Sequence, residues 1–298
     1  EAAGDEAVIV NESRSGPTVE GEMTPTAPMA AMFGYGGDQQ MHHTKGRRRE
    51  LADNCRAKKI PLITFDGGLL SSFGNISTSP DHHFRVSLYT PMNDGDFLSD
   101  NSPNDRWEML VKKFDVKYEP WRKSNQDDPI IFVMQPKDNW SMNELDPIDW
   151  FNGVYEKLRP ATDRKFIVRP HPNNVSNILE RENELPDDVE IQYTQKHFKG
   201  DEKKHYRFHF QEAIANAHAV VTHNSTASVD SCIRGIPTFC TSDLALCWDV
   251  CNKDLNDIET PKTPDRTQWV NDLGYKLWSI QEIKDGTVYK RFKERLGL

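Results

Sequence analysis

The second half of the chain alternates short apolar runs with polar loops. The runs at 130–134, 166–168 and 219–222 each end in polar residues such as Gln, Arg or Asn, and a further run lies at 238–240. Apolar runs of this length, bounded by polar residues or proline, are typical of buried strands. The pattern therefore predicts a set of short strands, and the first three deliver polar loops at their carboxyl ends.

Helical patterns separate these runs. Asp146 followed by Pro147 predicts a helix start, because aspartate caps helices and proline is favoured in the first turn. Apolar residues then recur at helical spacing, at Ile148, Phe151, Val154, Tyr155 and Leu158. We expect further helices near 174–182 and 207–217, with a strand near 189–193. Strands that alternate with helices predict right-handed crossovers and a mainly parallel sheet.

The first half of the chain is less regular. We expect a strand at 7–10, a loop rich in Gly, Pro, Ser and Thr at 13–28, a helix at 48–58 and a strand at 61–65. From 72 to 105 the pattern breaks into Asn, Asp, Ser, Pro and His, which favours loops. The glycine-rich stretch around Gly36 and Gly37 predicts a turn, or a backbone surface close to a ligand. Residues 117–129 are the candidate linker, and 279–298 are expected to be helical.

The segment 219–238 carries the strongest candidate site. A strand at 219–222 is followed by Asn224, Ser225 and Thr226, whose hydroxyl groups can cap a new helix. Backbone N–H groups at a helix start, together with these hydroxyls, can bind a phosphate. Asp230 would lie one turn into the helix, where a carboxylate can accept hydrogen bonds from a ribose. An ordinary capped helix in an α/β domain remains the alternative interpretation.

Two more strand ends carry polar residues suited to a phosphate. Arg169 and His171 follow the run 166–168, and prolines on both sides of His171 restrict the backbone. Gln135 and Asp138 follow the run 130–134. Because ligands of open α/β sheets bind beyond the carboxyl ends of the strands, these loops are expected to line one site.

The order of these motifs resembles a known family. Gln-x-x-Asp at 135–138, His171-Pro172, then Ser225-Thr226 with Asp230 and an Arg-Gly-x-Pro sequence at 234–237, is similar to capsule-polysaccharide transferases that use CMP-activated 3-deoxy-manno-octulosonate (Kdo). More distantly it resembles bacterial sialyltransferases with a His-Pro motif. Residues 63–71 are similar to a further family stretch, with Asp66 on its aspartate. Phe65, Gly68 and Leu70 depart from that stretch, so the sugar and the acceptor stay open.

The resemblance implies an α/β fold of two Rossmann-like domains that face a cleft, the glycosyltransferase B (GT-B) architecture. We expect an acceptor-side domain at 1–122, a nucleotide-sugar domain at 123–278, and a C-terminal helix at 279–298 that packs back on the first domain. Asp66 is implied as the catalytic base. Gly36, Gly37 and Gly67 are expected on the acceptor side.

We therefore predict a glycosyltransferase that moves a sugar from a nucleotide donor, with CMP-sugar favoured by the resemblance, to a hydroxyl of a glycan or glycolipid. The reaction is expected to invert the anomeric centre and to need neither a metal nor a cofactor, because Arg169, His171 and the hydroxyls of Ser225 and Thr226 would meet the charge of the leaving phosphate. Two alternatives stay open. One is a glycosyltransferase that acts on hydroxymethylated bases in viral DNA, and the other is a non-catalytic nucleotide-binding module.

Composition narrows these classes. The 298 residues carry a net charge of -9, so no overall positive field attracts nucleic acid or an anionic membrane. No apolar run approaches the roughly 20 residues of a transmembrane helix, so we expect a soluble protein. The five cysteines include Cys247 and Cys251, four apart, but no Cys-x-x-Cys pair, and we expect reduced thiols in the cytoplasm and no zinc site.

Overall fold

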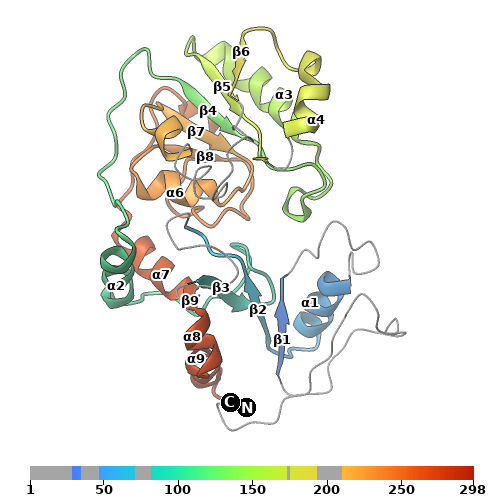
Figure 1. Ribbon diagram of the computed structural model, residues 1–298, viewed down its shortest axis with the longest axis vertical. Coiled ribbons are helices and arrows are strands. Elements are labelled where there is room, and N and C mark those ends of the chain that lie inside the picture. Colours follow the sequence, from blue (N-terminus) through green and yellow to red (C-terminus); the bar gives the residue numbers. More distant parts are fainter. Residues whose placement is uncertain (1–28, 35–46, 71–81, 173–174, 193–209) are drawn as a thin grey trace, which may run out of the picture. The chain divides into compact units, whose positions relative to one another are not determined.

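The computed structural model describes residues 29–34, 47–70, 82–172, 175–192 and 210–298, and these residues form two compact units (Figure 1). Within the described ranges, unit 1 holds residues 29–34, 47–68, 82–107 and 271–298, and unit 2 holds 69–70 and 108–270. The strand expected at 7–10, the loop at 13–28, and Gly36 and Gly37 lie outside the described residues. The domain boundaries expected from the sequence, at 1–122, 123–278 and 279–298, stay a prediction.

Unit 2 contains a parallel sheet of five strands in the order β6-β5-β4-β7-β8. The strands are β4 (Ile130–Val133), β5 (Phe166–Arg169), β6 (Val189–Ile191), β7 (Ala219–Thr222) and β8 (Thr238–Cys240). The predicted strands and their parallel arrangement are confirmed. β4 lies at the centre of the sheet, with β5 on one side and β7 on the other (Figure 1).

Helices cover both faces of this sheet. Residues 130 and 132 of β4 face a core with α3 and α4, while 131 and 133 face the helical residues 210–214. This alternation follows from the period of two along a strand. The helices of unit 2 include α3 (Pro147–Leu158), α4 (Val175–Glu180) and α6 (Ala227–Ile233). Single 3-10 turns occupy Trp140–Met142, Arg159–Ala161, Glu182–Glu184 and Leu255–Asp257.

The start of α3 shows how local sequence sets these elements. The Asp146 carboxylate accepts hydrogen bonds from the backbone N–H groups of Ile148 (2.9 Å) and Asp149 (3.4 Å), as predicted for its cap. Arg181 donates to the same carboxylate at 2.8 Å. The apolar stripe predicted for this helix lies in the core, where Phe151 and Phe166 pack around Phe132.

The candidate linker at 117–129 has no helix or strand, yet it is bound to unit 2. The N–H of Glu119 donates to Ile233 O (3.0 Å) and the N–H of Arg122 donates to Gly235 O (2.7 Å). Gly235 has φ of +71°, and a Cβ there would lie 2.0 Å from Pro120 O. Glycine is therefore required where this segment crosses the turn between α6 and β8.

Unit 1 contains a mixed sheet in the order β1-β2-β3-β9. The strands are β1 (Ala30–Phe33), β2 (Leu62–Asp66), β3 (His83–Leu88) and β9 (Leu277–Ser279). β1 runs parallel to β2, whereas β3 is antiparallel to both β2 and β9. The expectation of loops throughout 72–105 is therefore wrong, because β3 lies within that range. Its buried polar residues His83, Arg85 and Ser87 hide the apolar pattern of a strand.

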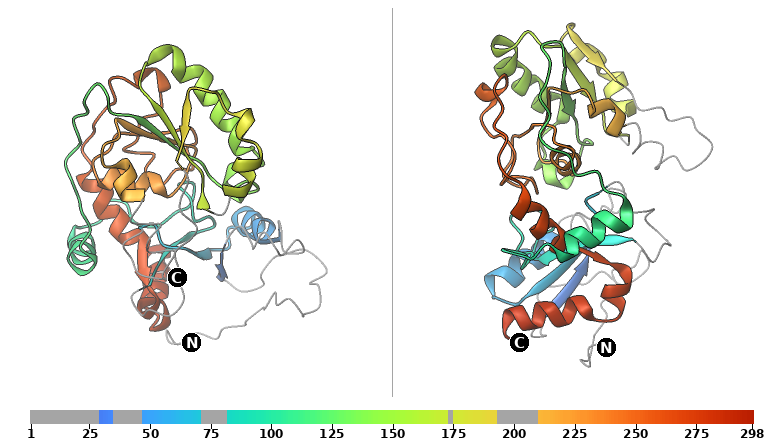
Figure 2. Two further views of the ribbon diagram at one scale, coloured as in Figure 1. Left: turned by 45° about the horizontal axis from the view of Figure 1, so that its top comes forward. Right: turned by 90° about the vertical axis from the view of Figure 1, so that its left-hand side faces the viewer.

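Helices also cover the sheet of unit 1, with α1 (Arg47–Ala57) on one face and α8 (Ile280–Lys284) and α9 (Thr287–Leu296) on the other (Figure 2). The expectation of a single helix at 279–298 is wrong in one respect. The chain breaks at Asp285 and at Gly286, where φ is +82°, and a second helix begins. No helix in the described part of the chain is both long and apolar enough to cross a membrane.

Two further helices, α2 (Asp105–Phe114) and α7 (Thr267–Lys276), complete the described structure. Arg106 of α2 contacts the segment that follows α7. Its guanidinium pairs with Glu282 at 2.6 Å, donates to Leu277 O at 2.7 Å and lies 3.9 Å from the centre of the Trp278 ring. These contacts join β9 and α8 to the first residues of α2, which belong to unit 1.

Candidate functional site

The register of the parallel sheet aligns the candidate residues of unit 2. Val133 of β4 lies opposite Arg169 of β5 and opposite Thr222 of β7. Gln135, His171 and Asn224 each follow these positions by two residues, so they leave the sheet at the same level of one edge. The structure thus brings the three predicted loops to the carboxyl edge of adjacent strands, as expected for an open α/β sheet.

Two amide side chains join the central loops at this edge. Gln135 Nε2 donates to Asn224 Oδ1 (2.8 Å), and the backbone N–H of Asn224 donates to Gln135 Oε1 (3.1 Å). Gln135 Nε2 also donates to Ser141 Oγ (2.8 Å), and Asn224 Nδ2 donates to Ser141 O (2.8 Å) and Ser242 Oγ (3.4 Å). Both residues are buried, and all four side-chain N–H groups are donated within these loops. Their position suits holding the loops rather than donating to a ligand.

Ser225 and Thr226 follow this pair and are partly exposed. Ser225 Oγ accepts a weak hydrogen bond from the N–H of Ala227 (3.3 Å), whereas the Thr226 side chain does not cap α6. Helix α6 spans only seven residues, so its dipole is smaller than that of a long helix. Both hydroxyls lie on partly exposed residues, where a ligand can contact them. Asp230 lies in the first turn of α6, as predicted, and is buried.

Arg169 and His171 bring a cation and an imidazole to the β5 end of the edge. Arg169 is buried, and its Nη1 donates to Gln192 Oε1 just beyond β6. Burial lowers the pKa of His171 from 6.5 to about 4. The imidazole is therefore neutral at neutral pH, and it carries one N–H donor.

Asp138 lies apart from Gln135, the buried residue of the same loop. It is exposed, with φ of +61°, on a turn in which the N–H of Asn139 donates to Pro136 O (3.2 Å). Asn139 in turn accepts from the backbone and the side chain of Ser141. Asp138 is thus the exposed member of the predicted donor-site set.

Sequence reasoning missed Thr241 and Ser242, which follow β8 at the same edge. Thr241 N donates to Thr222 O and Ser242 N to His223 O, both at 3.1 Å. Thr241 Oγ1 accepts from Trp150 Nε1 (2.8 Å) and lies 2.9 Å from His223 Nδ1. The run of small polar residues after 238–240 is the only sequence signal for this role, and it is shared by many turns.

Asp66, the predicted base, is the last residue of β2 in unit 1. It pairs directly with Arg85 across β2 and β3, and its carboxylate lies 3.4 Å from Arg85 Nη2. The other oxygen accepts from the N–H of Gly67 (2.7 Å). Gly67 is exposed, and a Cβ there would contact nothing within 4 Å, whereas at Gly68 it would lie 2.6 Å from His83 O. Only the second glycine is demanded by packing.

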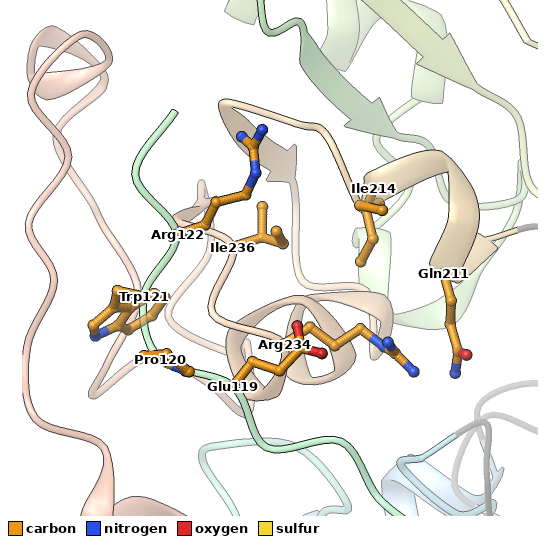
Figure 3. Close-up of a pocket in the computed structure, with 9 residues that line it drawn as sticks. Glu119, Pro120, Trp121, Arg122, Gln211, Ile214, Arg234 and Ile236 are labelled. Carbon is orange, nitrogen blue, oxygen red and sulfur yellow. The ribbon is translucent and has the colours of Figure 1, made fainter. Parts of the chain in front are cut away.

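A separate pocket of about 400 Å³ lies at the amino end of β8 (Figure 3). Its lining includes Glu119, Trp121, Arg122, Gln211, Arg234 and Ile236. In Figure 3, Ile236 and Ile214 line its apolar side, and the guanidinium of Arg234 extends toward Gln211. None of the predicted donor-site residues lines this pocket.

Comparison with known proteins identifies the architecture. No protein-family model matches the chain, and no curated protein matches its sequence. The chain is similar in structure to the β-Kdo 2,4-transferase KpsC of Thermosulfurimonas dismutans, with a TM-score of 0.52, 15% identity, and 87% of this chain and 86% of that chain covered. The β-Kdo 2,7-transferase of the same protein gives a TM-score of 0.45 at 11% identity, with 80% and 83% covered. The fold class expected from the sequence, α/β with two Rossmann-like domains of GT-B type, is confirmed.

Proposed function

We propose that this chain is a glycosyltransferase that moves a sugar from a nucleotide-activated donor to a hydroxyl of a glycan or glycolipid. One observation carries the proposal: the aligned carboxyl ends of β5, β4 and β7 gather Arg169, His171 and Ser225 at one edge of a sheet in a GT-B fold. The motif resemblance favours a CMP-sugar as donor, and the Kdo transferase activity of the structurally similar KpsC supports the same choice.

In the proposed reaction the leaving phosphate is met by donors that are already in place. Arg169 supplies positive charge, and His171, Ser225 and Thr226 supply neutral donors. Donors that meet charge as it develops lower the barrier more than donors that bind substrate and transition state equally. Gln135 and Asn224 are assigned a positioning role, because their N–H groups hold the loops together. The buried Asp230 is proposed to accept from the ribose, and the exposed Asp138 to contact the sugar.

Asp66 is the proposed base, which takes the proton of the acceptor hydroxyl as that oxygen attacks the anomeric carbon. A single displacement of this kind inverts the anomeric centre. Arg85 and the N–H of Gly67 fix the carboxylate in one orientation. No catalytic metal is needed in this scheme, since protein donors neutralise the phosphate. The free thiols of all five cysteines support a reducing compartment, which we propose is the cytoplasm.

A thermal-shift screen with CMP, CDP, UDP and GDP tests the donor site. A nucleotide that binds only the native state raises the melting temperature by mass action. His171→Ala and Ser225→Ala should each weaken binding of the best nucleotide by about 1 to 3 kcal/mol, the usual loss for a charge-assisted hydrogen bond. Arg234→Ala, in the pocket at the opposite end of the sheet, is the matched control and should bind normally. Unchanged affinity in both site variants would overturn the assignment.

A further inference from the structure

Three cysteines form a cluster at the end of β8. The sulfur atoms of Cys240, Cys247 and Cys251 all lie within 4.8 Å of one another, and those of Cys240 and Cys247 are 3.5 Å apart. Cys240 and Cys247 are buried, and Cys251 is partly exposed. This is the group of three metal-ligating side chains found among the described residues.

The spacing of the sulfur atoms matches a thiolate metal site. A tetrahedral zinc ion with Zn–S bonds of about 2.3 Å places its sulfur ligands roughly 3.8 Å apart. The backbone N–H of Cys251 donates to Cys247 O at 2.9 Å, so these two residues stand one helical turn apart and project to the same side. Cys240 completes the triangle from the strand. Shifts of about an ångström or less would bring all three sulfurs to bonding distance of one ion.

We propose that Cys240, Cys247 and Cys251 bind a structural Zn²⁺ ion as thiolates, with a water molecule as the fourth ligand on the exposed side of Cys251. Three thiolates and one Zn²⁺ carry a net charge of -1. Lys253 lies close enough to Cys251 to act on its charge, and its ammonium stands 4.6 Å from the centre of the Trp248 ring. The positive charge of this lysine offsets part of the negative charge of such a site.

Without a bound ion, burial and the neighbouring thiols determine the pKa of Cys240. Hydrogen bonds with Cys247 and Cys251, together with burial, raise the pKa of Cys240 well above its usual value of 9. Because cysteine binds zinc as a thiolate, protons leave the cluster as the ion binds. The expectation from the sequence that this chain holds no zinc is revised by this proposal.

The ion would stabilise the loop next to the candidate donor site. Cys240 pairs with Thr222 in the sheet. The next two residues, Thr241 and Ser242, hydrogen-bond to the end of β7 and to the loop that follows it. The segment from 241 to 251 would then be closed by metal at both ends. This role is independent of the proposed transferase activity, because it rests on the cysteines alone.

A disulfide between Cys240 and Cys247 is the competing chemistry. It needs an oxidant to remove two electrons and two protons, and the sulfur atoms must approach to about 2.05 Å. It would also leave Cys251 as a single thiol without a role. The three-sided arrangement favours the metal.

Zinc content and affinity test the proposal directly. The full chain is purified under reducing conditions, stripped of metal, and titrated with Zn²⁺ against a colorimetric zinc chelator. We expect one equivalent of zinc, with three protons released. Co²⁺ in place of Zn²⁺ should give a thiolate-to-metal charge-transfer band with the intensity of three Co–S bonds. Cys251→Ala, at the partly exposed position, should weaken zinc binding at least about 100-fold. Even the loss of a group that only hydrogen-bonds to a metal ligand lowers metal affinity about 10- to 100-fold.

Cys55→Ala and Cys232→Ala are the matched controls, because both thiols are buried and lie outside the cluster. Both should keep full zinc affinity. Circular dichroism shows whether each variant is folded, and Cys247→Ser provides a second cluster variant of similar size. Failure of the folded, reduced wild type to bind zinc would overturn the proposal. So would wild-type affinity in Cys251→Ala, or a Cys240–Cys247 disulfide in protein that binds no zinc after reduction.

Discussion

Gln135 and Asn224 hold each other through two hydrogen bonds at the carboxyl edge of unit 2, although they are 89 residues apart in the sequence. The side chain of one residue donates to the side chain of the other and accepts from its backbone. The loops after β4 and β7 are therefore joined directly, and Ser225 stands beside this junction. The arrangement explains how a site can be held rigid before a ligand binds.

Gln135→Leu should destabilise the protein by about 1 to 3 kcal/mol. It leaves the buried side-chain carbonyl and the backbone N–H of Asn224 without their Gln135 partner. Chemical denaturation followed by fluorescence measures the loss. Asp138→Asn is the matched control on the same loop. It is exposed, and asparagine tolerates the positive φ of this position, so the change should stay within about 0.5 kcal/mol. Equal effects of the two variants would contradict the junction's role.

The pKa of His171 predicts how stability depends on pH. Its pKa is about 4 in the folded protein and 6.5 ordinarily, so the unfolded chain binds the proton more readily. The stability contributed by the neutral imidazole is full above about pH 6.5 and is lost as the pH falls toward about 4. The pKa values of His218 and His223 shift in the same direction, also through burial.

The test is therefore a difference between two proteins. Unfolding of the wild type and of His171→Gln is measured from pH 7.5 to 4.5, and the wild type should lose more stability on acidification. A bound nucleotide should reduce this difference, since a phosphate beside the imidazole favours its protonated form. Parallel pH profiles of the two proteins would argue against a partly buried, neutral His171.

Asp66→Asn should lower turnover by about 10² to 10⁴-fold and leave nucleotide affinity nearly unchanged, because it removes a proton acceptor and keeps the shape. Steady-state kinetics and calorimetry measure the two quantities. Arg85→Gln is the control, since it breaks the same ion pair and keeps the carboxylate. A similar loss of turnover in both variants would assign the effect to the ion pair rather than to proton transfer.

The sequence predicted unit 2 better than unit 1 for a physical reason. β4, β5 and β7 are buried between two layers of helices, so their apolar runs are unbroken and easy to recognise. β3 places Ser87 in the core, where its hydroxyl lies 2.8 Å from Thr64 Oγ1, and a polar residue of this kind interrupts the pattern. β9 has only three residues between two helices, too few for a periodic signal.

The candidate site shows the same division. Gln135, His171 and Asn224 stand out because each follows a clear strand, but the bond between Gln135 and Asn224 depends on strand register, which the sequence does not reveal. The cysteine cluster was missed for a related reason. Cys247 and Cys251 are near each other along the chain, whereas Cys240 joins them only because the chain turns back after β8.

Turnover should survive an excess of EDTA, because protein donors take the place of a catalytic magnesium or manganese ion. Zinc content is measured in the same sample, so that loss of the proposed structural ion is separated from loss of a catalytic one. Activity that disappears on chelation while zinc is retained, and that returns with manganese, would refute the metal-free scheme. In that case Asp94 and Asp96, which lie after β3, are the carboxylates to examine first.

The central claim is that a nucleotide binds at the carboxyl edge of the unit 2 sheet, and hydrogen–deuterium exchange tests it most directly. Exchange is followed by mass spectrometry with and without the nucleotide that gives the largest thermal shift. We predict slower exchange in peptides that cover 169–172 and 222–228, with no change at 119–122 and 234–236, which line the pocket at the opposite end. Protection confined to the pocket peptides, or exchange unchanged at both ends under saturating nucleotide, would contradict it.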